Sequence, residues 1–214
     1  MAGAVVVGAG PGIGAAVARR FARAGLSVGL IARSETTVKA VADGITGDVL
    51  ALAADSTDEV GLRAALDRVV EEYGVPDVVV YNAAIIQPDA VGDLTARQHL
   101  DAWAVNVVGA ITTAAHVVPA MAERGSGSFI ITGGMPEPKA AYASLSLGKA
   151  GVRTLVTLLD QQYGAAGVHA ASVTVGGAVA PGTAYDPDDI AEHYWRLHTQ
   201  SRDQWEHEIS HRVD

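Results

Sequence analysis

The amino-acid sequence predicts an α/β fold in which a doubly wound parallel sheet of about seven strands lies between two layers of helices. Short apolar runs alternate with longer helical patterns along the 214 residues, and no linker or repeat interrupts them. The apolar runs are nearly continuous, as expected for strands that are covered on both faces. Strands and helices that alternate at this spacing form right-handed βαβ units. We therefore expect a single domain over residues 1–214 with three αβα layers.

The strands are expected where the apolar runs fall, at Val5–Val7, Val28–Ile31, Val49–Ala53, Val78–Tyr81, Phe129–Ile131 and Val168–Val175. Helices are expected to begin near Gly12, Glu35, Asp58, Ala96 and Ala143. Thr57 and Thr95 are candidate N-caps, because a hydroxyl at that position accepts a hydrogen bond from the first helical turn. A last helix, with Pro187 at its first position, and a last strand should follow from about residue 187. Trp205 and Ile209 would lie on the half-buried face of that strand.

The composition favours a soluble cytoplasmic protein. A net charge of −9 argues against a nucleic-acid-binding surface and against docking on anionic lipid. The absence of cysteine excludes disulfides and thiolate chemistry. No basic region precedes the first apolar run, so a signal peptide is not expected. The best candidate for a membrane span, Val105–Met121, is interrupted by polar residues and by Pro119, so none is expected.

The first strand runs into a glycine-rich segment, Gly8-Ala9-Gly10-Pro11-Gly12-Ile13-Gly14. Gly8 would allow a tight turn, Gly12 would let the backbone approach a pyrophosphate, and Gly14 would let the helix pack against the strand. The N-terminus of the helix would then face the phosphates. Because this pattern stands at the first strand–helix junction, it predicts a Rossmann-type dinucleotide site.

Several motifs together make the chain resemble the short-chain dehydrogenase/reductase family over essentially its whole length. They are the glycine spacing, Asp55 at the end of the third strand, Asn82-Ala83-Ala84 after the fourth, Asn106, and the segments Gly127–Ile131 and Lys149–Val152. The resemblance implies that Asp55 contacts the adenine ring and that Asn106 bends a helix and helps to organise a proton-relay water. The cofactor-binding residues expected from the glycine segment and this resemblance are Gly8, Gly10, Gly12, Ile13, Gly14, Arg33, Ser34, Asp55, Ser56, Asn82, Ala83, Lys149 and Gly177.

The end of the second strand indicates which cofactor is preferred. An acid there would accept both ribose hydroxyls and repel a 2′-phosphate, which favours NAD. This chain has Ala32-Arg33-Ser34 instead, and a guanidinium suits bidentate contact with a phosphate. We therefore expect NADP(H) to be favoured over NAD(H), although Arg33 could also be simply solvated.

Two positions depart from the family pattern. Where the resemblance implies a tyrosine four residues before the lysine, the chain has Leu145 before Lys149, and where it implies a serine, the chain has Gly134. Tyr142 could supply the missing acid from about one turn, roughly 5 Å, away if the helix begins early. The catalytic candidates are therefore Asn106, Lys149 and Tyr142. Other protic groups nearby are Tyr81, Thr132, Ser144 and Ser146.

The chain is similar to an atypical branch of the family, in which phenylalanine commonly replaces the catalytic tyrosine while the lysine remains. Val173-Thr174-Val175-Gly176-Gly177 also stands where the family usually has Pro-Gly. Three functions stay open. The first is an NADP(H)-dependent oxidoreductase that acts on a small carbonyl, alcohol or activated alkene with a non-standard proton donor. The second is a catalytically silent NADP(H)-binding protein that senses the cofactor or serves as a partner subunit, and the third is non-redox acid–base chemistry such as isomerisation.

Two further expectations concern assembly and metals. Small apolar residues recur in the helices at Ala96–Glu123 and Ala143–Gln162, which permits close contact between subunits. With the resemblance, this predicts a symmetric homodimer or a homotetramer built from dimers, with the last strand at the dimerising edge of the sheet. His207 and His211 are spaced by four, but no other set of acids and histidines completes a metal site, so none is expected.

Overall fold

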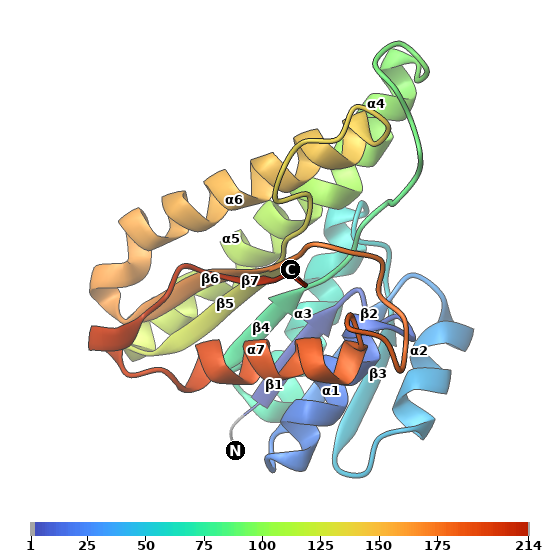
Figure 1. Ribbon diagram of the computed structural model, residues 1–214. Helices are drawn as coiled ribbons and strands as arrows, with labels where there is room; N and C mark the ends of the chain where they lie inside the picture. Colours follow the sequence, from blue (N-terminus) through green and yellow to red (C-terminus); the bar gives the residue numbers. More distant parts are fainter. Residues whose placement is uncertain (1–2, 214) are drawn as a thin grey trace.

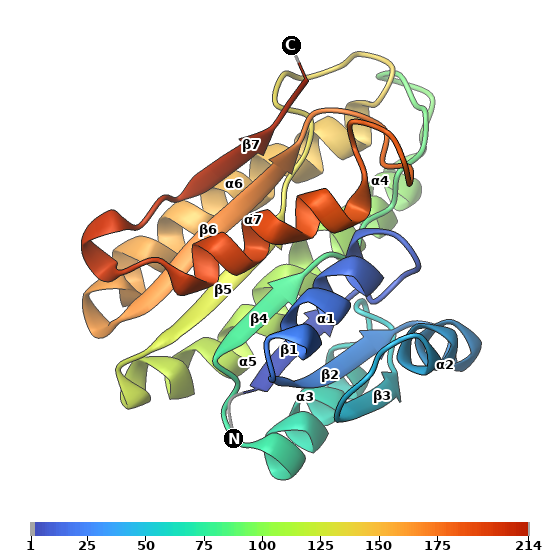
Figure 2. The same cartoon turned by 60° about the horizontal axis from the view of Figure 1, so that its bottom comes forward.

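The computed structural model describes residues 3–213 and contains one seven-stranded sheet with helices on both faces (Figures 1 and 2). The strands are β1 (Gly3–Val7), β2 (Ser27–Ala32), β3 (Val49–Ala53), β4 (Val78–Tyr81), β5 (Gly127–Thr132), β6 (Val168–Val175) and β7 (Glu208–His211). They lie in the order β3-β2-β1-β4-β5-β6-β7, and every neighbouring pair is parallel. The predicted doubly wound parallel sheet is therefore confirmed.

The helices are α1 (Ile13–Arg23), α2 (Glu35–Asp43), α3 (Glu59–Tyr73), α4 (Ala96–Trp103), α5 (Gly109–Arg124), α6 (Ala143–Tyr163) and α7 (Pro187–Thr199). A π-helical segment, Ala104–Val108, joins α4 to α5, and short 3₁₀ turns lie at Gly164–Ala166 and Arg202–Gln204. Figure 2 shows α1 and α7 in front of the sheet, with α5 and α6 behind it. Each layer buries its own apolar core against one face of the sheet.

The sequence predicted most element boundaries correctly, with two corrections at termini. The helix after β3 is capped by Asp58, whose carboxylate accepts a hydrogen bond from the Gly61 amide, so the prediction that Thr57 caps it is wrong. Thr95 does cap α4 and forms a capping box with Gln98. The last strand begins only at Glu208, after a 3₁₀ turn at Arg202–Gln204 and three residues of irregular chain, so the prediction that Trp205 lies in the strand is wrong.

The start of α6 bears on the site. Helix α6 begins at Ala143, as predicted, so the earlier start that would bring Tyr142 into the helix does not occur and Tyr142 occupies the N-cap position. By contrast, Pro187 stands at the first position of α7 as predicted, and Asp186 caps that helix. The continuous helical stretch Ala96–Arg124 is long and apolar enough to cross a membrane by length and composition alone. Of its most apolar window, 56% is buried inside the protein, which is typical of a core helix.

Candidate functional site

Two adjoining cavities follow the carboxyl ends of the central strands. The first has a volume of about 580 Å³ and lies between the glycine loop, the end of β5, the start of α6 and the segment after β6. The second, of about 370 Å³, lies at the ends of β2 and β3. Gly10, Asn82 and Ala84 line both cavities. Neighbouring β1 and β4 are where the winding of the sheet reverses, the usual ligand site in such folds.

The glycine loop has the shape that a pyrophosphate requires. Gly8 has a φ of 89°, and a Cβ there would lie 2.3 Å from the Ala83 nitrogen, so only glycine fits. A Cβ at Gly14 would lie 2.5 Å from the Gly8 oxygen. At Gly10 and Gly12 nothing lies within 4 Å of an added Cβ, which leaves bare backbone facing the cavities at the N-terminus of α1. These residues fit the phosphates of a dinucleotide.

The expected adenosine-binding residues line the second cavity. Arg33, Ser34, Asp55 and Ser56 all do so. The amide of Thr57 donates to the Asp55 carboxylate at 2.8 Å and is the main cause that lowers the pKa of Asp55 below its ordinary value. Ser34 also caps α2. Arg33 is exposed, and within residues 3–213 no carboxylate lies within ion-pair distance of its guanidinium.

A buried hydrogen-bond chain ties the glycine loop to β5 and α7. The Asn82 amide donates to the Gly8 oxygen at 2.8 Å, and its Oδ1 accepts from the Thr132 hydroxyl at 2.8 Å. Because the one hydrogen of the Thr132 hydroxyl is used in the bond to Asn82, the Tyr194 hydroxyl, 2.7 Å away, must donate to the Thr132 oxygen. Burial raises the pKa of Tyr194, so this proton stays in place. These hydrogen bonds fix the positions of Asn82 and Thr132, which line the first cavity.

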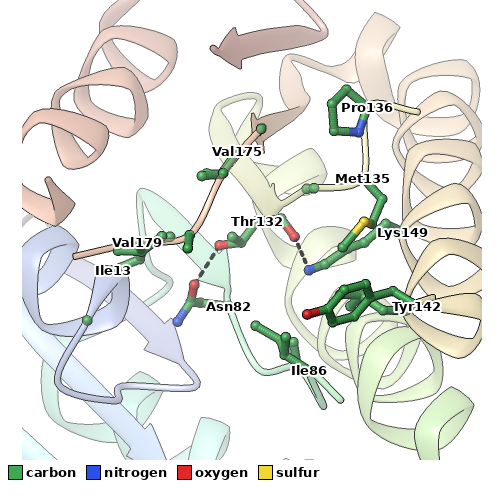
Figure 3. A pocket seen from close by; sticks show the side chains of 18 of the residues that line it. Ile13, Asn82, Ile86, Thr132, Met135, Pro136, Tyr142, Lys149, Val175 and Val179 are labelled. Atoms are coloured by element: carbon green, nitrogen blue, oxygen red, sulfur yellow. Dashed lines mark hydrogen bonds between the residues drawn. The ribbon is translucent and has the colours of Figure 1, made fainter. Parts of the chain in front are cut away.

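Lys149 lies at the base of the first cavity with 6% of its surface exposed. Its ammonium donates to the Thr132 oxygen at 2.7 Å (Figure 3). Burial, and to a lesser extent the positive charge of Arg153, lowers the pKa of Lys149 to about 8. The amine can therefore exchange a proton near neutral pH.

Tyr142 and Lys149 line the same cavity, and Figure 3 shows the Tyr142 ring reaching into it between Lys149 and Ile86. The position of Tyr142 is set by Asp89, in a loop that precedes α6 by more than 50 residues. The buried Asp89 carboxylate accepts from the amide and the hydroxyl of Ser144 at 3.0 and 3.1 Å. Its own backbone pairs with Ala141 and Ala143, on either side of Tyr142.

The other predicted protic groups are occupied elsewhere. The Tyr81 hydroxyl donates to the Val105 oxygen inside the core, and burial raises the pKa of Tyr81 to about 12. Ser144 is bound by Asp89, and Ser146 pairs with the backbone of Lys139. The Asn106 amide, in the π-helical segment, binds the backbone of Ile85. Asn106 thus lies behind the cavity wall and is not among the residues that line it.

The remaining predicted residues take mainly steric roles. Ile13 and Gly177 line the first cavity, and Ala83 lines the second. A Cβ at Gly177 would lie 2.4 Å from the Tyr185 ring, so that ring excludes any side chain there. Leu145 and Gly134 line the first cavity and bring no acid to it. His207 and His211 make separate contacts: His207 meets the Ala170 oxygen, and His211 meets His193 and the Ala184 oxygen.

Comparison with known proteins identifies the family. The family model described as short chain dehydrogenase matches residues 2–189. The chain belongs to the short-chain dehydrogenase family. It is 32% identical, over 87% of its length and 77% of the relative's, to a cis-4-hydroxycyclohexanecarboxylate dehydrogenase of Sinomonas cyclohexanicum. It is 36% identical to the probable oxidoreductase EphD of Mycobacterium tuberculosis, but this match spans 65% of the chain and only 24% of that protein.

The fold also matches solved structures of short-chain dehydrogenases. A metagenomic short-chain oxidoreductase in complex with NADP superimposes with a TM-score of 0.89 at 28% sequence identity. The match covers 98% of this chain and 96% of that one. The protein is therefore an oxidoreductase of the short-chain dehydrogenase type with a Rossmann-like fold.

The sequence did not reveal four residues that shape this short-chain dehydrogenase site. Asp89 and Tyr194 act from distant segments, so no local pattern could have indicated them. Met135 is the only non-glycine residue with a positive φ among residues 3–213, at 46°, and its side chain gives no such signal. Arg153 donates to the oxygens of Gly134 and Met135 at 2.8 and 2.6 Å. Its spacing of four from Lys149, on the same helix face, was the one available signal.

Proposed function

We propose that this short-chain dehydrogenase is an NADP(H)-dependent oxidoreductase that interconverts a small apolar ketone and its alcohol, using Tyr142 as a non-standard proton donor. The observation that carries the proposal is the pairing of Tyr142 and Lys149 in one cavity that opens beside the glycine loop. An activated alkene is a second substrate class that the same groups could serve.

The cofactor would lie along the two cavities. Gly10, Gly12 and the N-terminus of α1 would hold the pyrophosphate, and Asp55 and Ser56 would lie beside the adenosine. Arg33 would pair with a 2′-phosphate, which is the basis for preferring NADPH over NADH. The similar metagenomic oxidoreductase, which was solved with NADP, supports this choice. When bound, NADPH would supply the hydride that forms the new C–H bond.

The side chains of the first cavity would complete the reduction. As the C–H bond forms, the carbonyl π electrons move to the oxygen, which then needs one proton. Tyr142 would give its hydroxyl proton to that oxygen, and the product alcohol results. The Lys149 ammonium would stabilise the tyrosinate left behind, since opposite charges in a buried site attract strongly. With a pKa of about 8, Lys149 could also pass a proton to it.

The walls of the cavity indicate an apolar substrate. They are formed largely by aliphatic and methionine side chains: Ile13, Ile86, Met135, Leu145, Val175 and Val179. The relative from Sinomonas cyclohexanicum acts, by its name, on a hydroxylated cyclohexane carboxylate. We therefore place an alicyclic ketone or alcohol first among the candidate substrates.

A second candidate function rests on two residues. Leu145 and Gly134 stand where the family pattern has its tyrosine and serine, as in an atypical branch. General acid catalysis is typically worth about 10²–10⁴-fold, so loss without replacement would leave a very poor reductase. The chain would then be a catalytically silent NADP(H)-binding protein that senses the cofactor or serves as a partner subunit.

Turnover distinguishes the two. NADPH oxidation should be followed by the loss of the reduced-nicotinamide absorbance, with cyclohexanone and with 4-oxocyclohexanecarboxylate as substrates. We expect alcohol formation by the unmodified protein and none by Lys149→Met. NADPH binding with no reduction of either ketone, or of other carbonyl and activated-alkene compounds, would favour the silent protein.

The cofactor preference has its own prediction. NADPH should bind the unmodified protein more tightly than NADH, and Arg33→Asp should reverse this order, because the carboxylate repels a 2′-phosphate and accepts ribose hydroxyls. Fluorescence titration with both cofactors measures the effect. Arg23→Asp, at the end of α1 and outside both cavities, is the charge-matched control and should leave the order unchanged. Equal affinities in the unmodified protein would contradict the prediction.

The remaining proposals concern localisation, partners and oligomeric state. We infer a cytoplasmic protein with small-molecule substrates and without nucleic-acid or membrane partners, in keeping with the net charge of −9. Proteins of this family are commonly oligomeric, and we propose a homodimer or homotetramer for this one.

A further inference from the structure

The loop after β5 presents main-chain amides to the first cavity. The Gly133 amide donates to the Val173 oxygen at 2.8 Å, as a continuation of the sheet. Beyond it, the amides of Gly134 and Met135 meet no acceptor among residues 3–213, although both residues line the cavity and Gly134 is buried. Buried amides nearly always have a partner. An amide without one, at the wall of a cavity, is available to a ligand.

Arg153 sets the direction of the Met135 amide. Its guanidinium holds the oxygens of both Gly134 and Met135, and it pairs with Glu208 of β7 at 3.7 Å. Neither Arg153 nor Glu208 lines the cavity. The Gly134–Met135 peptide is trans, so its N–H points opposite to its oxygen. Because Arg153 lies outside the cavity lining, the oxygen that it holds should point away from the cavity and the N–H of Met135 toward it.

Two features show that the backbone conformation at Gly134 and Met135 is strained and that steric crowding does not force it. The left-handed backbone of Met135 is unfavourable for a side chain by about 1–2 kcal/mol, and such strain persists where the surroundings hold it. At Gly134 there is room for a side chain, since the nearest atom to an added Cβ is the Lys149 Cε at 3.6 Å. The glycine therefore leaves the peptide uncovered beside Lys149.

We propose that the Met135 amide binds the carbonyl oxygen of the substrate, as a main-chain replacement for a side-chain donor at position 134, and that Arg153 is its positioning residue. The inference rests on the proposed function for its substrate class. As hydride adds to the carbonyl carbon, the π electron pair moves to the oxygen, and a fixed N–H stabilises the charge that develops there. Figure 3 shows Met135 and Lys149 on the same side of the cavity, opposite Asn82.

The sequence permits a direct test. It contains only three methionines, Met1, Met121 and Met135, so labelling with ¹⁵N-methionine yields two backbone amide signals besides the chain terminus. Met121 is fully buried in α5 and serves as the internal control. Cyclohexanone is titrated into protein saturated with NADP⁺. We expect a saturable downfield shift of the Met135 amide proton and no shift of the Met121 signal.

The outcomes separate this proposal from the proposed function. A shift of Met135 without NADPH oxidation would uphold the amide site and overturn the reductase. Saturation-transfer evidence of bound ketone with an unmoved Met135 signal would overturn the amide site, and so would the failure of cyclohexanone to bind the cofactor complex. Arg153→Gln should abolish the shift and lower kcat/KM by about 10²-fold at unchanged NADPH affinity, the effect of losing one such donor. Arg153→Lys should restore part of both.

Discussion

At the scale of single residues, the chemistry of this pocket depends on how three side chains enter it from the start of α6. Tyr142 and Leu145 line the cavity, and Lys149 closes its base. Only Tyr142 and Lys149 of these three carry a proton that can move. The positions are close enough in sequence that motif reasoning found all of them. Whether Tyr142 could serve as the acid depended on where the helix begins. The structure places that start at Ala143, so Tyr142 reaches the cavity from the N-cap position.

Replacing Tyr142 by phenylalanine deletes one hydroxyl and keeps the ring that lines the cavity. If this hydroxyl is the acid, kcat should fall by about 10²-fold or more while the affinity for NADPH stays unchanged. Steady-state kinetics and cofactor titration measure both. Tyr163→Phe, at the far end of the same helix, is the matched control and should change neither. Retention of full activity in Tyr142→Phe would show that the proton comes from elsewhere, such as ordered water.

The buried Lys149 gives a prediction on stability. The folded-state pKa of about 8 lies below the ordinary value of 10.5, so between these values the unfolded chain holds the proton and the folded protein does not. The free energy of unfolding should therefore rise with pH in this window, by at most about 1.4 kcal/mol per pH unit. Urea unfolding at pH 8 and pH 9.5 should show a rise of about 1–2 kcal/mol in the unmodified protein relative to Lys149→Met. An identical pH dependence in both proteins would contradict this.

At the scale of elements, the N-terminus of α6 shows how distant segments position the site. The residue at the N-cap, Tyr142, makes no side-chain capping hydrogen bond. Asp89 supplies the cap from another loop, through the amide and hydroxyl of Ser144. A carboxylate near the first turn also interacts favourably with the helix dipole. The side chain that faces the cavity is thus held by a residue that does not line it.

Removing this cap should destabilise the protein measurably. Asp89→Ala leaves two buried donors of Ser144 without an acceptor, and we expect a loss of about 2–3 kcal/mol in the free energy of unfolding. Urea denaturation followed by circular dichroism measures it. Asp93→Ala, in the same loop, removes an exposed carboxylate that binds the Ala90 amide and should cost less than about 1 kcal/mol. Equal losses in the two variants would exclude the capping role.

Elements whose signals are local could be read from the sequence, and elements held by tertiary contacts could not. The strands at Val49–Ala53, Val78–Tyr81 and Val168–Val175 have the predicted bounds. Val78–Tyr81 and Val168–Val175 are buried on both faces, which requires continuous apolar runs, whereas Val49–Ala53 forms a less buried edge strand. The glycine loop was predictable because its glycine spacing is a local sequence pattern, although the contact that requires glycine at position 8 comes from Ala83. The loop between β5 and α6 has no such pattern. Its path depends on Arg153 and Asp89, which reach it from other segments.

The error at Thr57 has a simple physical origin. Two adjacent residues, Thr57 and Asp58, are both good N-caps, and propensity alone does not separate them. In the structure the hydroxyl and amide of Thr57 bind Asp55, which leaves Asp58 to cap α3. The competition is decided by a carboxylate that also lines the second cavity. The local turn at the second cavity therefore determines where the helix begins.

At the scale of the whole molecule, the helices on one face of the sheet retain an exposed apolar surface. Helices α5 and α6 pack against β5 and β6, and α4 packs beside α6 (Figure 1). The outward side chains of these helices and of the π-helical segment include several large hydrophobic residues. These are Leu100, Trp103, Val108, Ile111, Leu147 and Leu158, each at least 42% exposed. Small residues between them would let a second copy approach closely. A symmetric pair would cover these helices on both copies.

Substitution of a charge on this surface tests the predicted assembly. Ile111, 45% exposed in α5, lies outside both cavities. We expect the unmodified protein to sediment as a dimer or tetramer and Ile111→Glu to shift it toward monomer, because a carboxylate buried between two subunits has no partner to offset its desolvation. Val60→Glu, on α3 at 78% exposure, carries the same charge on a different helix and should leave the assembly intact. A monomer at every concentration of the unmodified protein would contradict the prediction, and dissociation by Val60→Glu alone would move the interface to α3.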